Sequence, residues 1–194
     1  MNSDIAESER RISNRLVSLI DIIFAVAVGD SIFALIFSDP SINNWPELDK
    51  ILTISNMSLF VAYCAVVLSW TGYHNMIENF PYRSNFWGKA RFCVDLFVVF
   101  TYIYFIYSKN NFSLFLFLFI IIFFLYGIGD MIRDLEYDQR VSQRSKSFIF
   151  MILFLCVYIS YHINILIALG ISRLIILIIN FLLLIIYRKI RLGF

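Results

Sequence analysis

Six segments of the sequence are apolar over the length of a membrane-spanning helix, and this pattern limits the possible folds more than any other feature. A helix needs about 20 mainly apolar residues to cross the hydrocarbon core of a bilayer. The segments that qualify are 16–37, 51–73, 92–108, 112–130, 148–168 and 171–187. Hydrophobic residues make up 60% of the chain, compared with about 45–50% in soluble proteins. We therefore predict an all-α polytopic membrane protein, in which residues 15–194 form one six-helix transmembrane domain after a polar N-terminus, residues 1–14.

The distribution of Lys and Arg predicts how these spans are oriented. Six spans put both termini on one side, and 13 of the 16 Lys and Arg residues fall in the segments of that side. Short cytoplasmic connections carry the excess of basic residues in membrane proteins. We therefore expect both termini and the charged connection 131–147 to be cytoplasmic.

The first predicted span contains two aspartates, Asp21 and Asp30. An ionisable side chain within a span costs at least ~2.5 kcal/mol on insertion scales, so it generally faces protein or a water path. At about 100° per residue, Asp21 shares a face with small residues such as Ser18 and Ala25, which allow a neighbouring helix to approach closely. Asp30 lies with Val26 near the middle of the span. We expect Asp21 to bond to a neighbouring helix and Asp30 to be the functional carboxylate, although both could simply bond to neighbouring helices.

A layer of polar side chains is predicted at the cytoplasmic ends of the first four spans, where Asp130 closes the fourth. We expect the six members of this layer on the first three spans to form a structural network that holds these spans together. Its predicted members are Arg15, Asp21, Trp70, His74, Arg91 and Asp95. Arg91 and Asp95 are four residues apart, which is the spacing at which opposite charges pair along one helix.

Other classes of function have little support in the sequence. No basic stripe suited to nucleic acid is present, so we expect no nucleic-acid partner. Cys64, Cys93 and Cys156 lie in apolar runs without metal-binding spacing, and we expect them to be buried free thiols. The predicted topology puts His74 and His162 on opposite sides of the membrane, where they cannot share a metal ion. We therefore expect neither an enzyme nor a bound cofactor or metal.

The start of the first span resembles a known family of channels. Arg15, Leu19-Ile20-Asp21 and Phe24-Ala25 are similar to the R-x-x-x-F-S-D-x-x-F-A-I signature of the transmembrane protein 175 family, the endolysosomal potassium channel and its prokaryotic six-span relatives. Trp70 and His74 match a W-x-x-x-H pattern in a later helical segment of that family. Leu19-Ile20 replaces the Phe-Ser of the family, so the chain resembles a divergent member.

This resemblance implies a potassium-type cation channel, a homotetramer in the cell membrane of a prokaryote with the first helices around a central pore. The pore-lining residues would be Ile22, Val26, Asp30 and Phe33. Val26 would form a hydrophobic gate, and four copies of Asp30 would form an acidic ring of the kind that favours cations. The implied partners are the lipid bilayer, further copies of the chain and permeant monovalent cations.

Two other functions stay open at this point. The same pore, opened by a cytoplasmic protein partner bound to the N-terminus or to residues 131–147, would make the chain an effector that depolarises the membrane. The carboxylates could instead relay protons in an ion or proton transporter. The inverted repeats and broken spans typical of transporters are not visible, apart from Gly-Ile-Gly at 127–129.

Overall fold

The computed structural model describes residues 3–37, 53–138, 143–165 and 170–192, and every regular element in these ranges is helical. The helices are α1 (Ser3–Phe37), α3 (Ile54–Asn79), α4 (Phe86–Tyr107), the short 3₁₀ helix η1 (Ser108–Asn110), α5 (Phe112–Tyr137), α6 (Gln143–His162) and α8 (Arg173–Leu192). The predicted all-α class is therefore confirmed. The N-terminal segment, which we expected only to be polar, is part of α1 from Ser3 onward.

Three of these helices are long and apolar enough to cross a membrane. They are Ile54–Asn79, Phe86–Asn110 and Phe112–Tyr137. A shorter apolar helix runs over Lys146–His162. These lengths fit the prediction of a membrane protein, whereas the count of six spans and the cytoplasmic position of the termini stay predictions.

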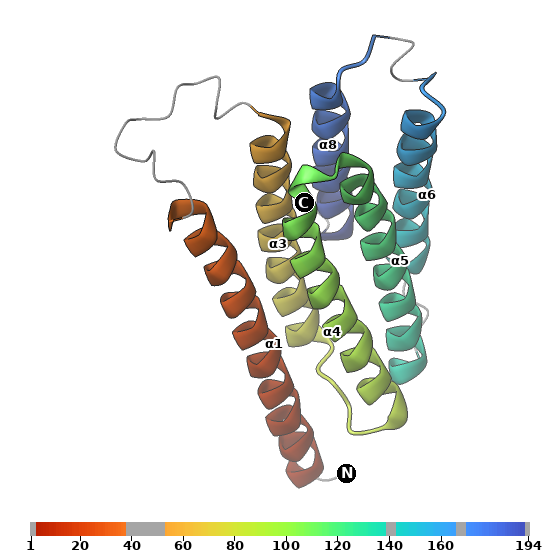
Figure 1. The fold of residues 1–194 in the computed structure, drawn as a ribbon. Helices are drawn as coiled ribbons and strands as arrows, with labels where there is room; N and C mark the ends of the chain where they lie inside the picture. The colour runs from red at the N-terminus through yellow and green to blue at the C-terminus, as the bar shows by residue number, and fades with distance from the viewer. Residues whose placement is uncertain (1–2, 38–52, 139–142, 166–169, 193–194) are drawn as a thin grey trace.

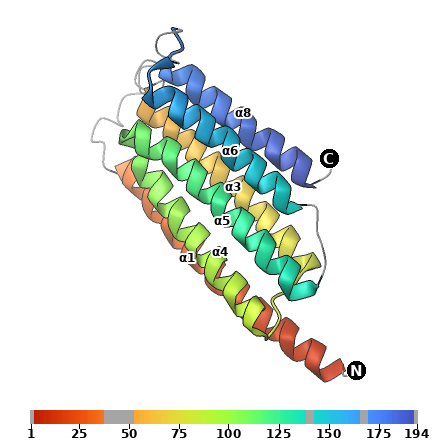
Figure 2. The same ribbon diagram turned by 90° about the vertical axis from the view of Figure 1, so that its right-hand side faces the viewer.

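The helices form an elongated bundle in which neighbours in sequence run in opposite directions (Figure 1). Figure 2 shows that α1 begins and α8 ends at the same end of the bundle, which we call the terminal end. α3 and α5 also end there, and α4 begins there. α5 packs between α4 and α6, α3 packs against α8, and α1 lies at one edge beside α4.

Side-chain caps fix where the apolar helices begin. Thr53 Oγ1 accepts a hydrogen bond from Asn56 N at 3.3 Å, and Asn111 Oδ1 accepts one from Leu114 N at 3.1 Å. Asn85 caps α4 in the same way, with a 2.8 Å bond from Gly88 N. Such caps satisfy backbone N–H groups that have no partner within the helix. Each apolar run therefore begins as a helix at a defined residue.

Aromatic rings fill much of the core between α4, α5 and α6. Phe105 stacks on Phe115 with ring centres 4.3 Å apart, and Phe119 stacks on Phe154 at 4.8 Å. These four rings are all almost fully buried. Offset and edge contacts between aromatic rings stabilise beyond the area they bury, so this stack fixes the positions of α4, α5 and α6 relative to one another.

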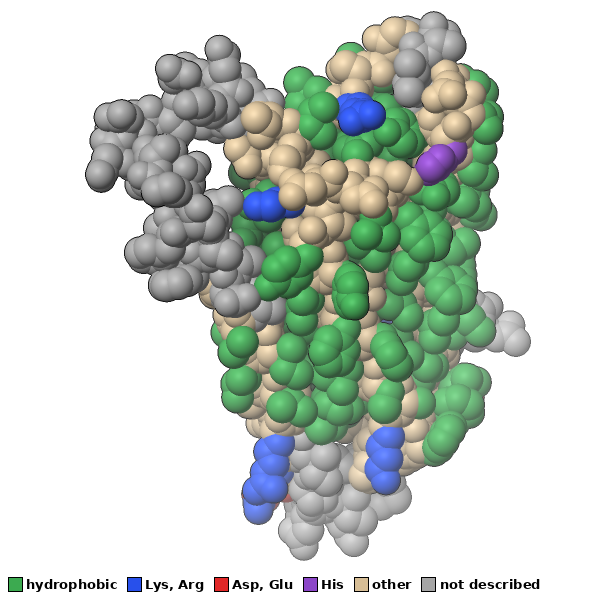
Figure 3. Space-filling model, in the orientation of Figure 1, with side chains coloured by type: hydrophobic (Ala, Val, Ile, Leu, Met, Phe, Trp, Pro, Cys, Tyr) green, Lys and Arg blue, Asp and Glu red, His purple; other side chains and the backbone are tan. Residues whose placement is uncertain are grey.

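The outer surface is apolar around the middle of the bundle. Figure 3 shows one face, on which hydrophobic side chains cover the waist and Lys and Arg lie towards the two ends. Large exposed side chains of this kind include Phe97, Tyr104 and Phe117. Contiguous exposed apolar surface marks contact with a membrane or a partner, and this distribution is consistent with a lipid bilayer around the waist.

α5 continues past the end that we predicted for its span. We ended the span at residue 130 and placed the following charged residues in a connection, but α5 is helical to Tyr137 and ends at Asp138, which adopts a left-handed conformation with φ 51°. Arg133 and Glu136 are buried on this last stretch of helix. Their charges have partners within the protein, so the stretch folds into the bundle.

Candidate functional site

Asp21 attaches α1 to α3 near the terminal end. One carboxylate oxygen, Oδ1, accepts a 3.0 Å hydrogen bond from the indole Nε1 of Trp70 and lies 3.0 Å from Nε2 of His74. The two rings of α3 also touch edge to face, with centres 4.8 Å apart. The structure thus brings together three of the six members of the predicted network, whereas the side chain of another member, Arg15, is exposed.

The face of α1 that packs on the bundle is formed by larger side chains than we expected. Ile20 is 1% exposed, and Phe24 and Val28 pack against the core. Ser18 and Ala25, which we placed on the contact face, are exposed. Apolar side chains four residues apart bury more surface against α4 than the small residues would, so they determine the contact.

The opposite face of α1 is uncovered. Leu19, Ile22 and Val26 are 45%, 61% and 65% exposed. Ile22 and Val26 are two of the four predicted pore-lining residues. The side chains of the other two, Asp30 and Phe33, lie outside the described part of the structure.

A second anchor at the terminal end is the buried ion pair of Arg91 and Glu136. The Nη1 of Arg91 lies 2.6 Å from Oε2 of Glu136, and both side chains are at most 1% exposed. Nη2 of Arg91 donates a 2.6 Å bond to the carbonyl oxygen of Phe80. Arg91 therefore pairs across helices, from α4 to α5.

The predicted ion pair between Arg91 and Asp95 is wrong. Asp95 Oδ2 accepts a 2.5 Å hydrogen bond from the hydroxyl of Tyr82, which in turn lies 3.1 Å from the hydroxyl of Tyr73. Glu136 offers Arg91 a carboxylate in a water-excluded position, where an ion pair needs close geometry and further hydrogen bonds to offset desolvation. Arg91 and Asp95 both belong to the polar layer, but with different partners.

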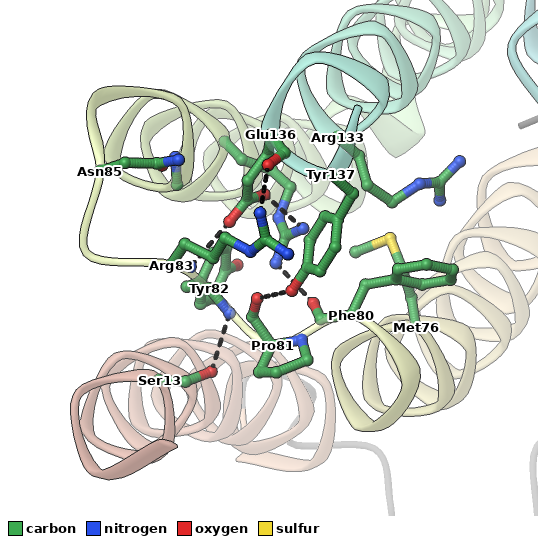
Figure 4. A network of polar contacts seen from close by, with 12 residues as sticks. Ser13, Met76, Phe80, Pro81, Tyr82, Arg83, Asn85, Arg133, Glu136 and Tyr137 are labelled. Carbon is green, nitrogen blue, oxygen red and sulfur yellow. Dashed lines mark hydrogen bonds and ion pairs between the residues drawn. The ribbon is translucent and has the colours of Figure 1, made fainter. Parts of the chain in front are cut away.

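The connection between α3 and α4 joins these anchors (Figure 4). Tyr82 N donates to Ser13 Oγ of α1 at 3.1 Å, and Arg83 N donates to Glu136 Oε1 of α5 at 2.7 Å. Arg83 Nη1 also donates to the carbonyl oxygen of Glu136 at 2.9 Å. Burial and the charge of Asp95 raise the pKa of the Tyr82 hydroxyl well above its ordinary value, so Tyr82 stays a hydrogen-bond donor.

Asp130, which the sequence places in the polar layer without a partner, forms a third anchor. Its Oδ1 lies 2.9 Å from Arg191 Nη2 and 3.2 Å from Arg133 Nη1, and Oδ2 accepts a 2.8 Å bond from the hydroxyl of Ser147. These contacts join α5 to α8 and α6. The spacing of Asp130, Arg133 and Glu136, three residues apart each time, was the available signal, because it puts alternating charges on one side of a continuing helix.

Two hollows lie among these side chains. A cleft of about 830 Å³ beside the start of α1 is lined by residues that include Ser13, His74, Tyr82 and Arg83. A smaller cavity of about 50 Å³ lies deeper, between α1, α3, α4, α5 and α8. Across the described ranges, no three His, Cys, Asp or Glu side chains gather in a way that could hold a metal ion.

The expectation of buried thiols is wrong for two of the three cysteines. Cys93 and Cys156 are exposed and Cys64 is partly buried. Cys93 and Cys156 lie on outer faces of α4 and α6, so an apolar neighbourhood in sequence here indicates exposure on the surface of the bundle.

Known proteins give no further guide to the site. The chain matches no model of a protein family, no curated protein and no solved structure at a significant level. The resemblance to the transmembrane protein 175 family therefore stays a hypothesis that rests on the residues of α1 and α3.

Proposed function

We propose that this protein is a cation channel of the cell membrane, formed by several copies of the chain with α1 lining the pore. The observation that carries the proposal is the two-sided character of α1. One face, with Ile20 at 1% exposure, packs on the bundle, while Ile22 and Val26 on the other face are 61% and 65% exposed. An apolar face at the edge of the bundle is available to further copies.

The anchor at Asp21 supports this proposal because it fixes the rotation of α1. Its bonds to Trp70 and His74 hold the side of the helix that carries Asp21 against α3. The side opposite the packed face is therefore presented in one orientation. A hydrophobic gate needs such a defined ring of apolar side chains, since it closes by excluding water from a narrow passage.

From helical phase we expect Asp30 to lie close to this uncovered face. At about 100° per residue, Asp30 falls roughly 40° from Val26, and Phe33 falls about 20° from it on the other side. Repeated around an axis, Asp30 would form an acidic ring and raise the local concentration of cations. The resemblance to the transmembrane protein 175 family implies that this channel is a tetramer and prefers potassium.

Recording of the purified protein in planar bilayers, under gradients of KCl and NaCl, tests the proposal. We expect cation-selective current in the parent and a larger current in Val26→Ala, because the smaller side chain widens the apolar passage. Asp30→Asn should lower the permeability of cations relative to anions. Val67→Ala is the matched control, because Val67 is 57% exposed on α3 and should leave the current unchanged.

Two outcomes would refute the proposal. One is the absence of current from protein that is folded in the bilayer. The other is an equal effect of Val26→Ala and Val67→Ala, because the uncovered face of α1 would then be an ordinary lipid contact.

A further inference from the structure

The 50 Å³ cavity between the helices is lined by more basic than acidic groups. Three arginines, Arg91, Arg188 and Arg191, border it together with two aspartates, Asp95 and Asp130. Ser69, Tyr73 and Tyr126, which carry hydroxyl groups, also line it. The lining thus holds one positive charge more than it holds negative charges.

Both aspartates of the lining are engaged by other groups. Asp130 lies 2.9 Å from Arg191 and 3.2 Å from Arg133, and Asp95 accepts the hydroxyl of Tyr82 at 2.5 Å. Arg91 is paired with Glu136 at 2.6 Å. Of the three arginines that line this cavity, Arg188 has no carboxylate at ion-pair distance within the described ranges.

The guanidinium of Arg188 also has a hydrogen-bond donor that the described part of the chain does not use. Nη2 donates to Thr71 Oγ1 at 3.2 Å. Nε is buried and has no hydrogen-bond partner among the described residues. A buried donor without an acceptor is destabilising, and more so when it is charged, so this position favours a ligand that accepts hydrogen bonds and carries negative charge.

Gly72 of α3 makes room for this guanidinium. A Cβ atom at position 72 would lie 1.8 Å from Nη1 and 1.9 Å from Nη2 of Arg188. Any other residue at this position would push the guanidinium away from the backbone of α3. Gly72 therefore leaves room for the guanidinium of Arg188 beside the backbone of α3 at the cavity wall.

We propose that this cavity binds a phosphate group. Its volume has room for about three to five atoms of the size of a water molecule, at roughly 10–15 Å³ each, which matches the phosphorus and oxygens of one phosphate. A guanidinium binds phosphate through two parallel N–H donors, and Nε with the adjacent Nη2 of Arg188 form such a pair. The group is supplied either by free phosphate or by the headgroup of an anionic lipid, since basic pockets between helices bind such headgroups.

A phosphate here would bridge α3 and α8 and balance the excess charge. The proposal does not depend on the channel, because its test measures binding and not current. Delipidated protein in detergent is titrated with radiolabelled inorganic phosphate, and native mass spectrometry of protein purified gently from the membrane detects retained phosphatidylglycerol. We expect binding in at least one arm, and competition between the two ligands if both bind.

Two variants and one control make the test specific. Arg188→Gln removes the charge, and Gly72→Ala keeps the charge but displaces the guanidinium, so each should weaken binding at least tenfold. Lys189→Gln removes an exposed charge from the next position of α8 and should bind as the parent does. Binding in neither arm overturns the proposal, and so does undiminished binding in folded Arg188→Gln and Gly72→Ala.

Discussion

At the scale of single residues, the charges buried at the terminal end decide how the helices meet. Arg91 is fully buried and meets one carboxylate, that of Glu136, at 2.6 Å. Removal of one partner from a buried ion pair leaves an uncompensated charge and typically costs about 3–5 kcal/mol. The two residues belong to α4 and α5, so their pair specifies one contact between two otherwise apolar helices.

We predict that Glu136→Gln destabilises the protein strongly although the side chain keeps its shape. The amide cannot balance Arg91, so the free energy of unfolding should fall by about 3–5 kcal/mol, seen as a lower midpoint of thermal unfolding in detergent. Asp138→Asn, an exposed acid two residues further on, is the control and should change the midpoint little. Similar effects of the two variants would show that the pair is solvated.

The hydroxyl of Tyr82 predicts a loss of stability at high pH. Its raised pKa means that the folded state favours the neutral form, so the stabilisation is complete below the ordinary tyrosine pKa of 10.0 and is lost as the pH rises through the higher folded value. The thermal midpoint of the parent should therefore fall above pH ~10. Tyr82→Phe should lower the thermal midpoint at neutral pH, but the midpoint of this variant should fall less at high pH. Tyr104→Phe is the control, because it changes a 70% exposed side chain, and its thermal midpoint should equal that of the parent at every pH.

At the scale of the elements, the sequence predicted where apolar helices occur better than where they end. A hydropathy pattern shows only the apolar part of a helix, so α3 and α5 were expected to stop near residues 73 and 130. In the structure they continue to Asn79 and Tyr137. Charged residues with partners inside the protein look like loop residues in a hydropathy pattern. The depth of a residue along its span follows from the hydropathy pattern, so the sequence predicted that Asp21 and His74 lie at the same depth. The partners of Arg91 and Asp130 lie on stretches of helix that the pattern assigned to connections or on other helices, so the sequence did not predict them.

The turn into α4 depends on a glycine. A Cβ atom at Gly88 would lie 2.0 Å from the carbonyl oxygen of Arg83, which is backbone and cannot move away without breaking the connection that contacts Ser13 and Glu136. We predict that Gly88→Ala lowers the thermal midpoint, or prevents stable purification, although alanine normally favours a helix by about 1 kcal/mol. Gly29→Ala is the control, because nothing lies within 4 Å of a Cβ there, and it should leave stability unchanged or raise it. Equal effects would mean that the connection adapts at little cost.

At the scale of the whole molecule, one chain leaves the uncovered face of α1 with two possible neighbours, lipid or another copy. Cysteine crosslinking distinguishes them. On a background without Cys64, Cys93 and Cys156, Val26→Cys should form disulfide-linked dimers under mild oxidation in native membranes, because a ring of copies brings equivalent residues close to the axis. A disulfide requires Cβ atoms about 3.5–4.5 Å apart, so random collisions in the bilayer should give little product.

Val67→Cys, at a position that is also more than half exposed, should stay monomeric under the same oxidant. Dimers from both positions would indicate collision, and dimers from neither would place the Val26 face against lipid. The anchor at Asp21 leads to a further prediction. Asp21→Asn should loosen the contact of α1 with α3 and so reduce the yield of dimer from Val26→Cys, whereas Val67→Cys should stay monomeric.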